Sequence, residues 1–377
     1  MKLIYCIASV YNPGGMERVL LNKVRYLSAK GGYDLTVVTT DQHGRPPFYT
    51  FPEQVRMVDL GVNYIDDKFK HPLTKIVGYY RRRRWHRHRL TEFLLQEKAD
   101  IVISLYPCES GFIPKIKDGS KKILELHQCK FVRLQYGRKG LLGLTDRYRT
   151  WLDERMVRKF DRFVVLTHED AGYWGNLENL IVIPNAALNL PVHPADPSVH
   201  RVIAVGRLDH QKGFDRLLQA WADIPAERRG DWRLDIFGQG EWKEMLEQMI
   251  RDLDIVESAS ICAPTQQIFE EYARSSILAM SSHYEGFPMV MIEAMACGLP
   301  VVTFGYKCGP KDIITDGIDG RIAKDGDVPA LSAALEQVMN DPDLRARMSE
   351  AARKVTARYS EKTVMQQWET CFQQLLA

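Results

Sequence analysis

Two glutamates stand eight positions apart in the segment SSHYEGFPMVMIEAMACGLPVVTF, at Glu285 and Glu293. An apolar run that resembles a strand precedes them, and Pro288 suits the first turn of a following helix. Glu285 then falls in the strand-to-helix loop and Glu293 inside the helix, so both carboxylates can face one ligand. The backbone N–H groups of Gly286 and Phe287 point out of the helix N-terminus, which favours a phosphate. By themselves, two such glutamates are more often a surface loop residue and a partner in a helix salt bridge.

A second candidate group of residues lies in the segment VIAVGRLDHQKGFDRLLQAW. Arg207 and Lys212 bracket a strand-to-helix loop there, so both side chains can reach a diphosphate. The guanidinium binds two oxygens at once, whereas the lysine acts as a movable point charge. Such a pair after a strand is also typical of a solvated loop. A further loop, FGQGEW with Gly238, follows a strand, but its G-x-G pattern alone is a weak signal.

The first half of the chain offers two further candidates. Gly14 and Gly15 stand between the first strand and a long helix in YNPGGMERVLLNKVRYLSAKG, where a glycine lets the backbone approach a ligand closely. Their spacing departs from G-x-G-x-x-G and argues against a dinucleotide fingerprint; a tight turn is the alternative. His127 follows the strand KKILEL. A lone histidine in such a place is more often structural or merely exposed.

Two D-x-D triplets raise the question of a metal site, at Asp252 with Asp254 and at Asp325 with Asp327. We expect neither to follow a strand. The first triplet lies late in a helix and the second caps one, so metal binding is the disfavoured interpretation.

Short apolar runs alternate with amphipathic stretches throughout the chain, which predicts parallel sheets with intervening helices in an α/β fold. The 377-residue length favours two domains. We place the linker at Pro191, Pro194 and Pro197, which gives an N-terminal domain over 1–190, a C-terminal domain over 198–360, and a last helix over 361–377 that crosses back to the first domain. The expected strands are 3–9, 35–39, 101–105, 122–126, 163–167 and 181–184 in the first half, and 201–205, 234–237, 259–262, 277–281 and 301–304 in the second.

The glutamate segment resembles the E-x7-E motif of retaining GT-B glycosyltransferases of family four. The segments G-R-x5-K-G, at Gly206 to Gly213, and G-G-x-E-R-V, at Gly14 to Val19, are similar to that family as well. The resemblance covers nearly the whole chain and implies two Rossmann-like domains with parallel sheets that face a central cleft. Within it, the segment GPKDIITDGIDG departs from the family pattern, because Asp312 stands where glutamate is usual.

The resemblance also implies roles for the candidate residues. Glu293 would bind the donor ribose, while Glu285 and the backbone of Gly286 and Phe287 would contact the donor sugar. Arg207 and Lys212 would stabilise the leaving diphosphate. The remaining assignments are a loop near the donor phosphates and the acceptor for Gly14 and Gly15, a donor-sugar contact for His127, and loops beside the nucleotide for Gly206, Gly238 and Pro288.

The implied reaction moves a hexose or N-acetylhexosamine from a nucleoside-diphosphate sugar with retention at the anomeric carbon. A UDP-sugar is the favoured donor and GDP-mannose the next; neither a metal nor another cofactor is expected. The segment VTTDQHGRPPFYTFP resembles the branch that builds bacterial exopolysaccharide and lipopolysaccharide, so the acceptor would be a glycan or a polyprenyl-linked glycan. The alternatives are a non-catalytic, membrane-associated protein that binds nucleotide-sugars and, less favoured, a Rossmann oxidoreductase.

Composition favours a cytoplasmic protein. The seven cysteines form no C-x-x-C pair, and the first apolar stretch is too short for a signal peptide or a membrane span. Charge differs between the halves: residues 1–190 hold 31 Lys and Arg against 20 Asp and Glu, net +11, whereas residues 191–377 hold 20 against 28, net −8.

A basic and aromatic run, KIVGYYRRRRWHRHRL, is the main source of the positive charge in the first half. Arginines next to aromatic rings suit an anionic membrane surface. We therefore expect peripheral attachment at the inner face of the cytoplasmic membrane. A plain solvated face is the second interpretation, and nucleic acid, for which no motif is present, is not an expected partner. The membrane-binding residues would be Arg81, Arg82, Arg83, Arg84 and Trp85.

Overall fold

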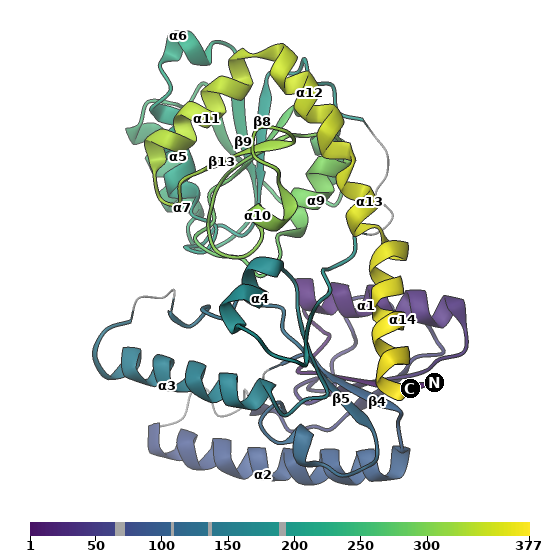
Figure 1. The fold of residues 1–377 in the computed structure, drawn as a ribbon. Coiled ribbons are helices and arrows are strands. Elements are labelled where there is room, and N and C mark those ends of the chain that lie inside the picture. Colours follow the sequence, from purple (N-terminus) through teal and green to yellow (C-terminus); the bar gives the residue numbers. More distant parts are fainter. Residues whose placement is uncertain (65–71, 107–108, 135–137, 188–193) are drawn as a thin grey trace. The chain divides into compact units, whose positions relative to one another are not determined.

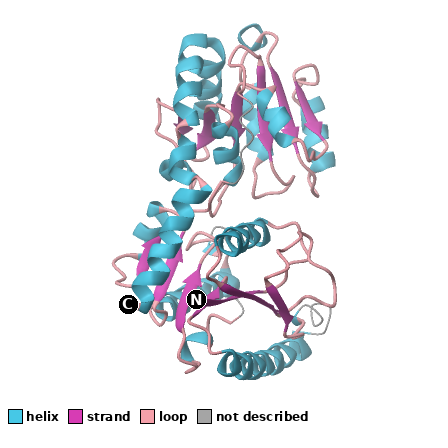
Figure 2. Ribbon diagram, turned by 90° about the vertical axis from the view of Figure 1, so that its right-hand side faces the viewer, coloured by secondary structure: helices cyan, strands magenta, loops and turns pink. Residues whose placement is uncertain are grey.

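The computed structural model describes residues 1–64, 72–106, 109–134, 138–187 and 194–377, with the side chains of 72–76 left out. It divides the chain into two compact units, each with one parallel sheet that has helices on both faces (Figures 1 and 2). The expected linker falls in part on 188–193, outside the described residues. The first unit comprises Met1–Leu166, Ala171–Ile183 and Met365–Ala377, and the second comprises Thr167–Asp170 and Pro184–Val364.

The first unit contains a seven-stranded sheet in the order β3-β2-β1-β4-β5-β6-β7, and every pair is parallel. Its central strands read as continuous apolar runs because helices cover both faces of the sheet. Leu3 and Ile4 are fully buried, as are their neighbours Ile101 and Val102. The strands are β1 (Lys2–Ile7), β2 (Asp34–Thr39), β3 (Arg56–Asp59), β4 (Ile101–Ser104), β5 (Lys121–Glu125), β6 (Arg162–Val165) and β7 (Leu180–Val182).

Long helices pack on the first sheet. α1 buries Leu20, Val24 and Leu27, a spacing of four and three residues that forms one stripe. Within the described residues, no helix combines the length and apolar character that a membrane span requires. The helices are α1 (Gly15–Lys30), α2 (Pro72–Glu97), the short 3-10 helix η2 (Ile113–Lys115) and α3 (Gly140–Val157); α4 (His168–Trp174) and α14 (Glu361–Leu376) each run from the second unit into the first.

The second unit contains a six-stranded parallel sheet in the order β10-β9-β8-β11-β12-β13. β8 and β11 are neighbours at its centre, although they are far apart in sequence, so the loops that follow them lie at the same edge. The strands are β8 (Arg201–Val205), β9 (Arg233–Phe237), β10 (Ala259–Cys262), β11 (Ile277–Met280), β12 (Val301–Phe304) and β13 (Gly320–Ala323).

Helices of the second unit bury strongly apolar faces. In α5, Phe214, Leu217, Leu218 and Trp221 are at most 2% exposed, and burial of each such side chain contributes roughly 1.5–3 kcal/mol. The helices are α5 (Phe214–Ala222), α6 (Ala226–Arg229), α7 (Lys243–Asp252), α8 (Ile268–Ala273), α9 (Met289–Ala296), α10 (Pro310–Ile313), α11 (Val328–Asn340), α12 (Pro342–Arg353) and α13 (Val355–Tyr359).

Candidate functional site

Two strand-to-helix loops of the second unit are joined by direct contacts. The loop after β8 runs to α5, and the loop after β11 runs to α9. The backbone N–H of His283 donates to the carbonyl of Gln211 at 2.8 Å, and the Ser281 hydroxyl donates to the carbonyl of Lys212 at 3.0 Å. The rings of His210 and His283 stack with centroids 4.3 Å apart. These contacts fix the two loops to one another.

Lys212 and Glu285, predicted from separate sequence segments, form an ion pair between these loops. The Lys212 Nζ lies 2.6 Å from the Glu285 Oε1, and the two side chains are 15% and 10% exposed. The Ser282 hydroxyl donates to the same carboxylate oxygen at 2.8 Å. The cation and the carboxylate are therefore held at one edge of the sheet and retain a small opening to solvent.

Arg207 belongs to the same cluster but is much more open. Its side chain is 68% exposed; its guanidinium lies 3.1 Å from Asp209 Oδ2 and donates to Gln211 Oε1 at 2.8 Å. The amide of Gln211 in turn donates to Glu285 Oε2 at 3.4 Å. The guanidinium is thus linked to the ion pair and remains accessible to an anion from solvent.

The start of α9 presents backbone donors beside this cluster. Pro288 is the N-cap residue, so the helix begins at Met289, one position later than the expected proline in the first turn. Among the residues that the structure describes, the N–H groups of Gly286 and Phe287 donate no hydrogen bond. Glu293 is the fifth residue of α9 and partly buried. Burial, together with the charge of Glu293, raises the pKa of Cys297 to about 11.

Glycines allow the loops after β8 and β9 to approach closely. A Cβ atom on Gly238 would lie 1.9 Å from the Gly206 carbonyl oxygen, and a Cβ on Gly206 would lie 2.9–3.0 Å from the Lys212 side chain. The Lys212 methylenes therefore pass over Gly206 in space that a larger residue would fill. Both glycines have this steric role in positioning the cation; a contact with the nucleotide stays a prediction.

Asp312, which departs from the family pattern, has a structural role within the second unit. Its carboxylate accepts the backbone N–H groups of His168 at 2.6 Å and Glu169 at 3.2 Å, which are the first two residues of α4. The hydroxyl of Thr167 accepts the N–H of Asp170 at 3.1 Å, so two side chains cap this helix. The segment Thr167-His168-Glu169 therefore forms the capped N-terminus of α4.

The expectation that neither D-x-D triplet follows a strand is wrong for the second triplet. Asp325 follows β13, a strand that the sequence analysis did not include, and lies 3.7 Å from Arg216. Asp327 caps α11, as expected, by accepting the N–H of Ala330 at 3.1 Å. These contacts give the second triplet structural partners.

In the first unit, His127 lies in a cluster of buried charges. Its Nε2 is 3.1 Å from Glu125 Oε1, and Glu125 also forms a buried ion pair with Lys23 of α1. Burial opposes the charge of Glu125, but Lys23 and His127 outweigh it and bring the pKa of Glu125 to about 2. The Nζ of Lys23 lies 3.9 Å above the ring centre of Trp368 in α14. Lys23, Glu125 and Trp368 were not among the residues predicted from the sequence.

Gly14 and Gly15 lie at the start of α1 in the same unit. Gly14 is the N-cap residue, and a Cβ there would lie 2.0 Å from a carboxylate oxygen of Glu17, whereas nothing lies within 4 Å of a Cβ on Gly15. Burial raises the pKa of Glu17, and the charge of His127 lowers it in part. Gly14 follows β1 and His127 follows β5, and the strands of this parallel sheet end at the same edge. The glycine loop and His127 therefore belong to one edge of the first sheet.

Two family models match the chain and cover adjacent stretches of it. "Glycosyltransferase Family 4" matches residues 13–187, and "Glycosyl transferases group 1" matches residues 190–355. An uncharacterized glycosyltransferase of Haemophilus influenzae is 28% identical over 98% of this chain and 99% of its own length. The amylovoran biosynthesis glycosyltransferase AmsD of Erwinia amylovora is 35% identical over 55% of this chain and 61% of its own length.

Solved structures show the same fold. HepE of Anabaena, crystallised in complex with UDP, matches with a TM-score of 0.75 at 16% identity, over 99% of this chain and 100% of that chain. The two parallel-sheet units are those of a GT-B protein. The chain therefore belongs to the family 4 (group 1) glycosyltransferases and is an enzyme of the GT-B fold.

Proposed function

We propose that this glycosyltransferase moves a hexose or N-acetylhexosamine from a nucleoside-diphosphate sugar to a glycan or polyprenyl-linked acceptor in bacterial cell-surface polysaccharide synthesis. The bond between the anomeric carbon and the diphosphate breaks, and a bond to an acceptor hydroxyl oxygen forms on the same face of the sugar. The hydroxyl proton leaves with the departing diphosphate or with solvent. No enzyme nucleophile and no metal enter this scheme.

The observation that carries the proposal is the Lys212–Glu285 ion pair beside the start of α9. A departing nucleoside diphosphate gains negative charge, and fixed cations and amides stabilise such charge without reorganisation. The ammonium of Lys212, the exposed guanidinium of Arg207 and the N–H groups of Gly286 and Phe287 provide these groups within one unit. They supply the positive charge for which other transferases use a metal ion.

The carboxylates have a different task, because a negative group cannot stabilise a diphosphate. Glu285 orients Lys212 and accepts a hydrogen bond from a hydroxyl of the donor sugar. Glu293, inside α9, accepts hydrogen bonds from the ribose hydroxyls. In the first unit, His127 is the candidate for the sugar contact, and its Nε2 lies 3.1 Å from Glu125 Oε1. The names of two similar proteins support the substrates: HepE was crystallised with UDP, and AmsD serves amylovoran synthesis.

The proposal is tested with Lys212→Ala and Glu293→Ala, assayed for sugar transfer and for donor hydrolysis. Loss of one group that stabilises transition-state charge lowers kcat by about 100-fold to 1000-fold. Lys243→Ala is the matched control, because Lys243 is an exposed lysine of α7 in the same unit and pairs only loosely, at 3.7 Å, with Glu247. Thermal shift with UDP-, GDP- and ADP-sugars identifies the base. Full transfer activity in both site variants would refute the assignment.

NMR of the product tests retention directly, because the anomeric configuration is read from the coupling constant of the transferred sugar. The alternative, a non-catalytic protein that binds nucleotide-sugars at a membrane, predicts a donor-induced thermal shift with neither transfer nor hydrolysis. Chelation separates the metal-free scheme from a metal-dependent one. Activity that a chelator abolishes, and that a divalent cation restores, would overturn the metal-free part alone.

Attachment to the inner face of the cytoplasmic membrane through the arginine run of α2 belongs to the same proposal. Some arginines of the run bind backbone carbonyls of the first unit and are not available for lipid contact. Arg82 donates to the carbonyl of Val62, and Arg89 donates to the carbonyl of Leu60, both at 2.5 Å. Arg81, Arg84 and Trp85 are exposed and remain the candidates for lipid contact.

A further inference from the structure

The outward face of α3 is apolar. Leu141, Leu144, Tyr148, Trp151 and Leu152 are 81%, 61%, 59%, 44% and 41% exposed. Their spacing of three and four residues places them in one stripe along the helix. A surface helix of an ordinary domain has the reverse pattern, with its apolar stripe turned to the core, so this face calls for a partner that is not the first sheet.

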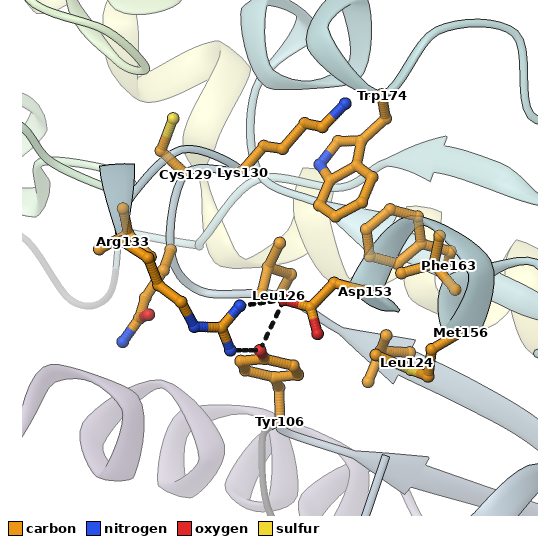
Figure 3. A pocket seen from close by; sticks show the side chains of 13 residues that line it. Tyr106, Leu124, Leu126, Cys129, Lys130, Arg133, Asp153, Met156, Phe163 and Trp174 are labelled. Atoms are coloured by element: carbon orange, nitrogen blue, oxygen red, sulfur yellow. Dashed lines mark hydrogen bonds and ion pairs between the residues drawn. The ribbon is translucent and has the colours of Figure 1, made fainter. Parts of the chain in front are cut away.

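The inward face of α3 is polar, and ion pairs fix it. Asp146 lies 2.9 Å from the Arg138 guanidinium. Glu154 lies 2.7 Å from Lys130. Asp153 forms an ion pair with Arg133 (Figure 3). These three acids are all the acidic residues of α3, and each is paired with a cation from the segment before the helix.

The Asp153 contact shows how closely the helix is held. Asp153, Arg133 and the Tyr106 hydroxyl meet at the pocket in Figure 3, where Tyr106 donates to Asp153 Oδ2 at 3.1 Å. Burial and then Asp153 raise the pKa of Tyr106 to about 12, so the phenol keeps its proton. Rotation of α3 to bury its leucines would break this cluster. The Asp153 cluster therefore keeps the apolar stripe of α3 on the exposed side of the helix.

The charges beside the stripe are positive. Arg147 and Arg149 stand on its two sides, and the Arg155 guanidinium lies 4.4 Å from the ring centre of Trp151. The rings of Trp151 and Tyr148 stack, with centroids 5.7 Å apart. All three acids of α3 are paired with cations that precede the helix, Glu154 with a side chain that is 42% exposed, so the net charge beside the stripe is positive.

We propose that α3 is an interfacial helix that docks on an anionic lipid bilayer. The leucines would enter the acyl boundary, the aromatic pair would lie at headgroup level, and the arginines would contact lipid phosphates. A two-fold contact with a second copy of the chain fits less well, because it would bring arginines against arginines. The proposal extends the membrane attachment proposed above to a second helix, and it uses none of the candidate sugar-transfer residues, so it can fail while the sugar-transfer assignment stands.

Cosedimentation with phosphatidylcholine vesicles, with and without phosphatidylglycerol, tests the proposal. The variant Leu144→Asp/Trp151→Asp should lower binding to anionic vesicles by about tenfold or more, since it removes apolar contact and adds negative charge. Ile318→Asp is the matched control, because Ile318 is 57% exposed in the second unit. The variant Arg81→Ser/Arg84→Ser measures how much of the binding to anionic vesicles depends on α2. Circular dichroism and thermal unfolding confirm that each variant is folded.

Quenching by brominated lipids locates the helix itself. The parent protein should lose tryptophan fluorescence on brominated anionic vesicles, and Trp151→Phe should lose much less. Equal binding of the parent and the α3 variant, or no difference in quenching, would overturn the proposal. So would a parent dimer in solution that Leu144→Asp/Trp151→Asp dissociates, because the face would then belong to a second copy.

Discussion

Replacement of Lys23 by methionine is the sharpest test of the buried charges in the first unit. Lys23 is 4% exposed and Glu125 is fully buried, so neither charge has water to replace its partner. The pKa of Glu125 falls from 4.5 to about 2 in the folded protein, and one pKa unit corresponds to 1.36 kcal/mol. The ionised carboxylate therefore contributes about 3 kcal/mol to the free energy of unfolding at neutral pH.

Lys23→Met removes one of the two partners that lower the pKa of Glu125, so burial, which raises that pKa, is then opposed by His127 alone. We expect the free energy of unfolding to fall by about 3–5 kcal/mol at neutral pH. The folded pKa is depressed, so the stabilisation is present above about pH 4.5 and is lost as the pH falls toward 2. The difference between parent and variant should therefore narrow across that window.

Urea unfolding at neutral and at acid pH measures both effects. The control is Lys23→Met/Glu125→Gln, which removes both charges and should recover most of the lost stability, because a neutral pair of similar volume leaves no buried charge. A double variant no more stable than the single one would refute the explanation. A parent-to-variant difference that stays constant from pH 7 to pH 3 would refute it as well.

Two further predictions concern other buried groups. Burial raises the pKa of Glu109 to about 7, so the folded state binds the extra proton and the free energy of unfolding should fall by about 3 kcal/mol between pH 4.5 and 7; Glu109→Gln should abolish that decline in urea titrations. Gly238→Ala should raise the donor KM and lower stability by about 1–3 kcal/mol, because its Cβ meets the Gly206 carbonyl. Gly172→Ala, with nothing within 4 Å, is the control, and equal losses in both would contradict the steric explanation.

The sequence predicted the central strands well and missed two at the sheet edges. β3 and β13 are edge strands of four residues, and three of the four residues of β3 are exposed. An edge strand pairs on one side only, so it needs no continuous apolar run and leaves little periodicity to detect. The error on the second D-x-D triplet follows from the omission of β13.

The site divides in the same way. Lys212 and Glu285 were predictable because each lies in a recognisable loop that follows a clear strand, and parallel strands bring such loops to one edge. Lys23 was not, although a signal existed: it falls in the buried stripe of α1, where a lysine is unexpected. Its partner stands 102 positions later in an apolar strand, and no local pattern joins the two.

The same chemical pair thus occurs in both units with opposite consequences. Lys212 and Glu285 keep side-chain exposures of 15% and 10%, whereas Lys23 and Glu125 have 5% and 0%. Lys212 is more open to solvent than Lys23, so exchange of its carboxylate for the phosphates of an incoming donor costs less desolvation. The ammonium of Lys23, covered by Trp368, would have to leave a buried carboxylate unpaired in order to make that exchange. The difference in accessibility therefore supports the proposed ligand-binding role of the first pair and a structural role for the second.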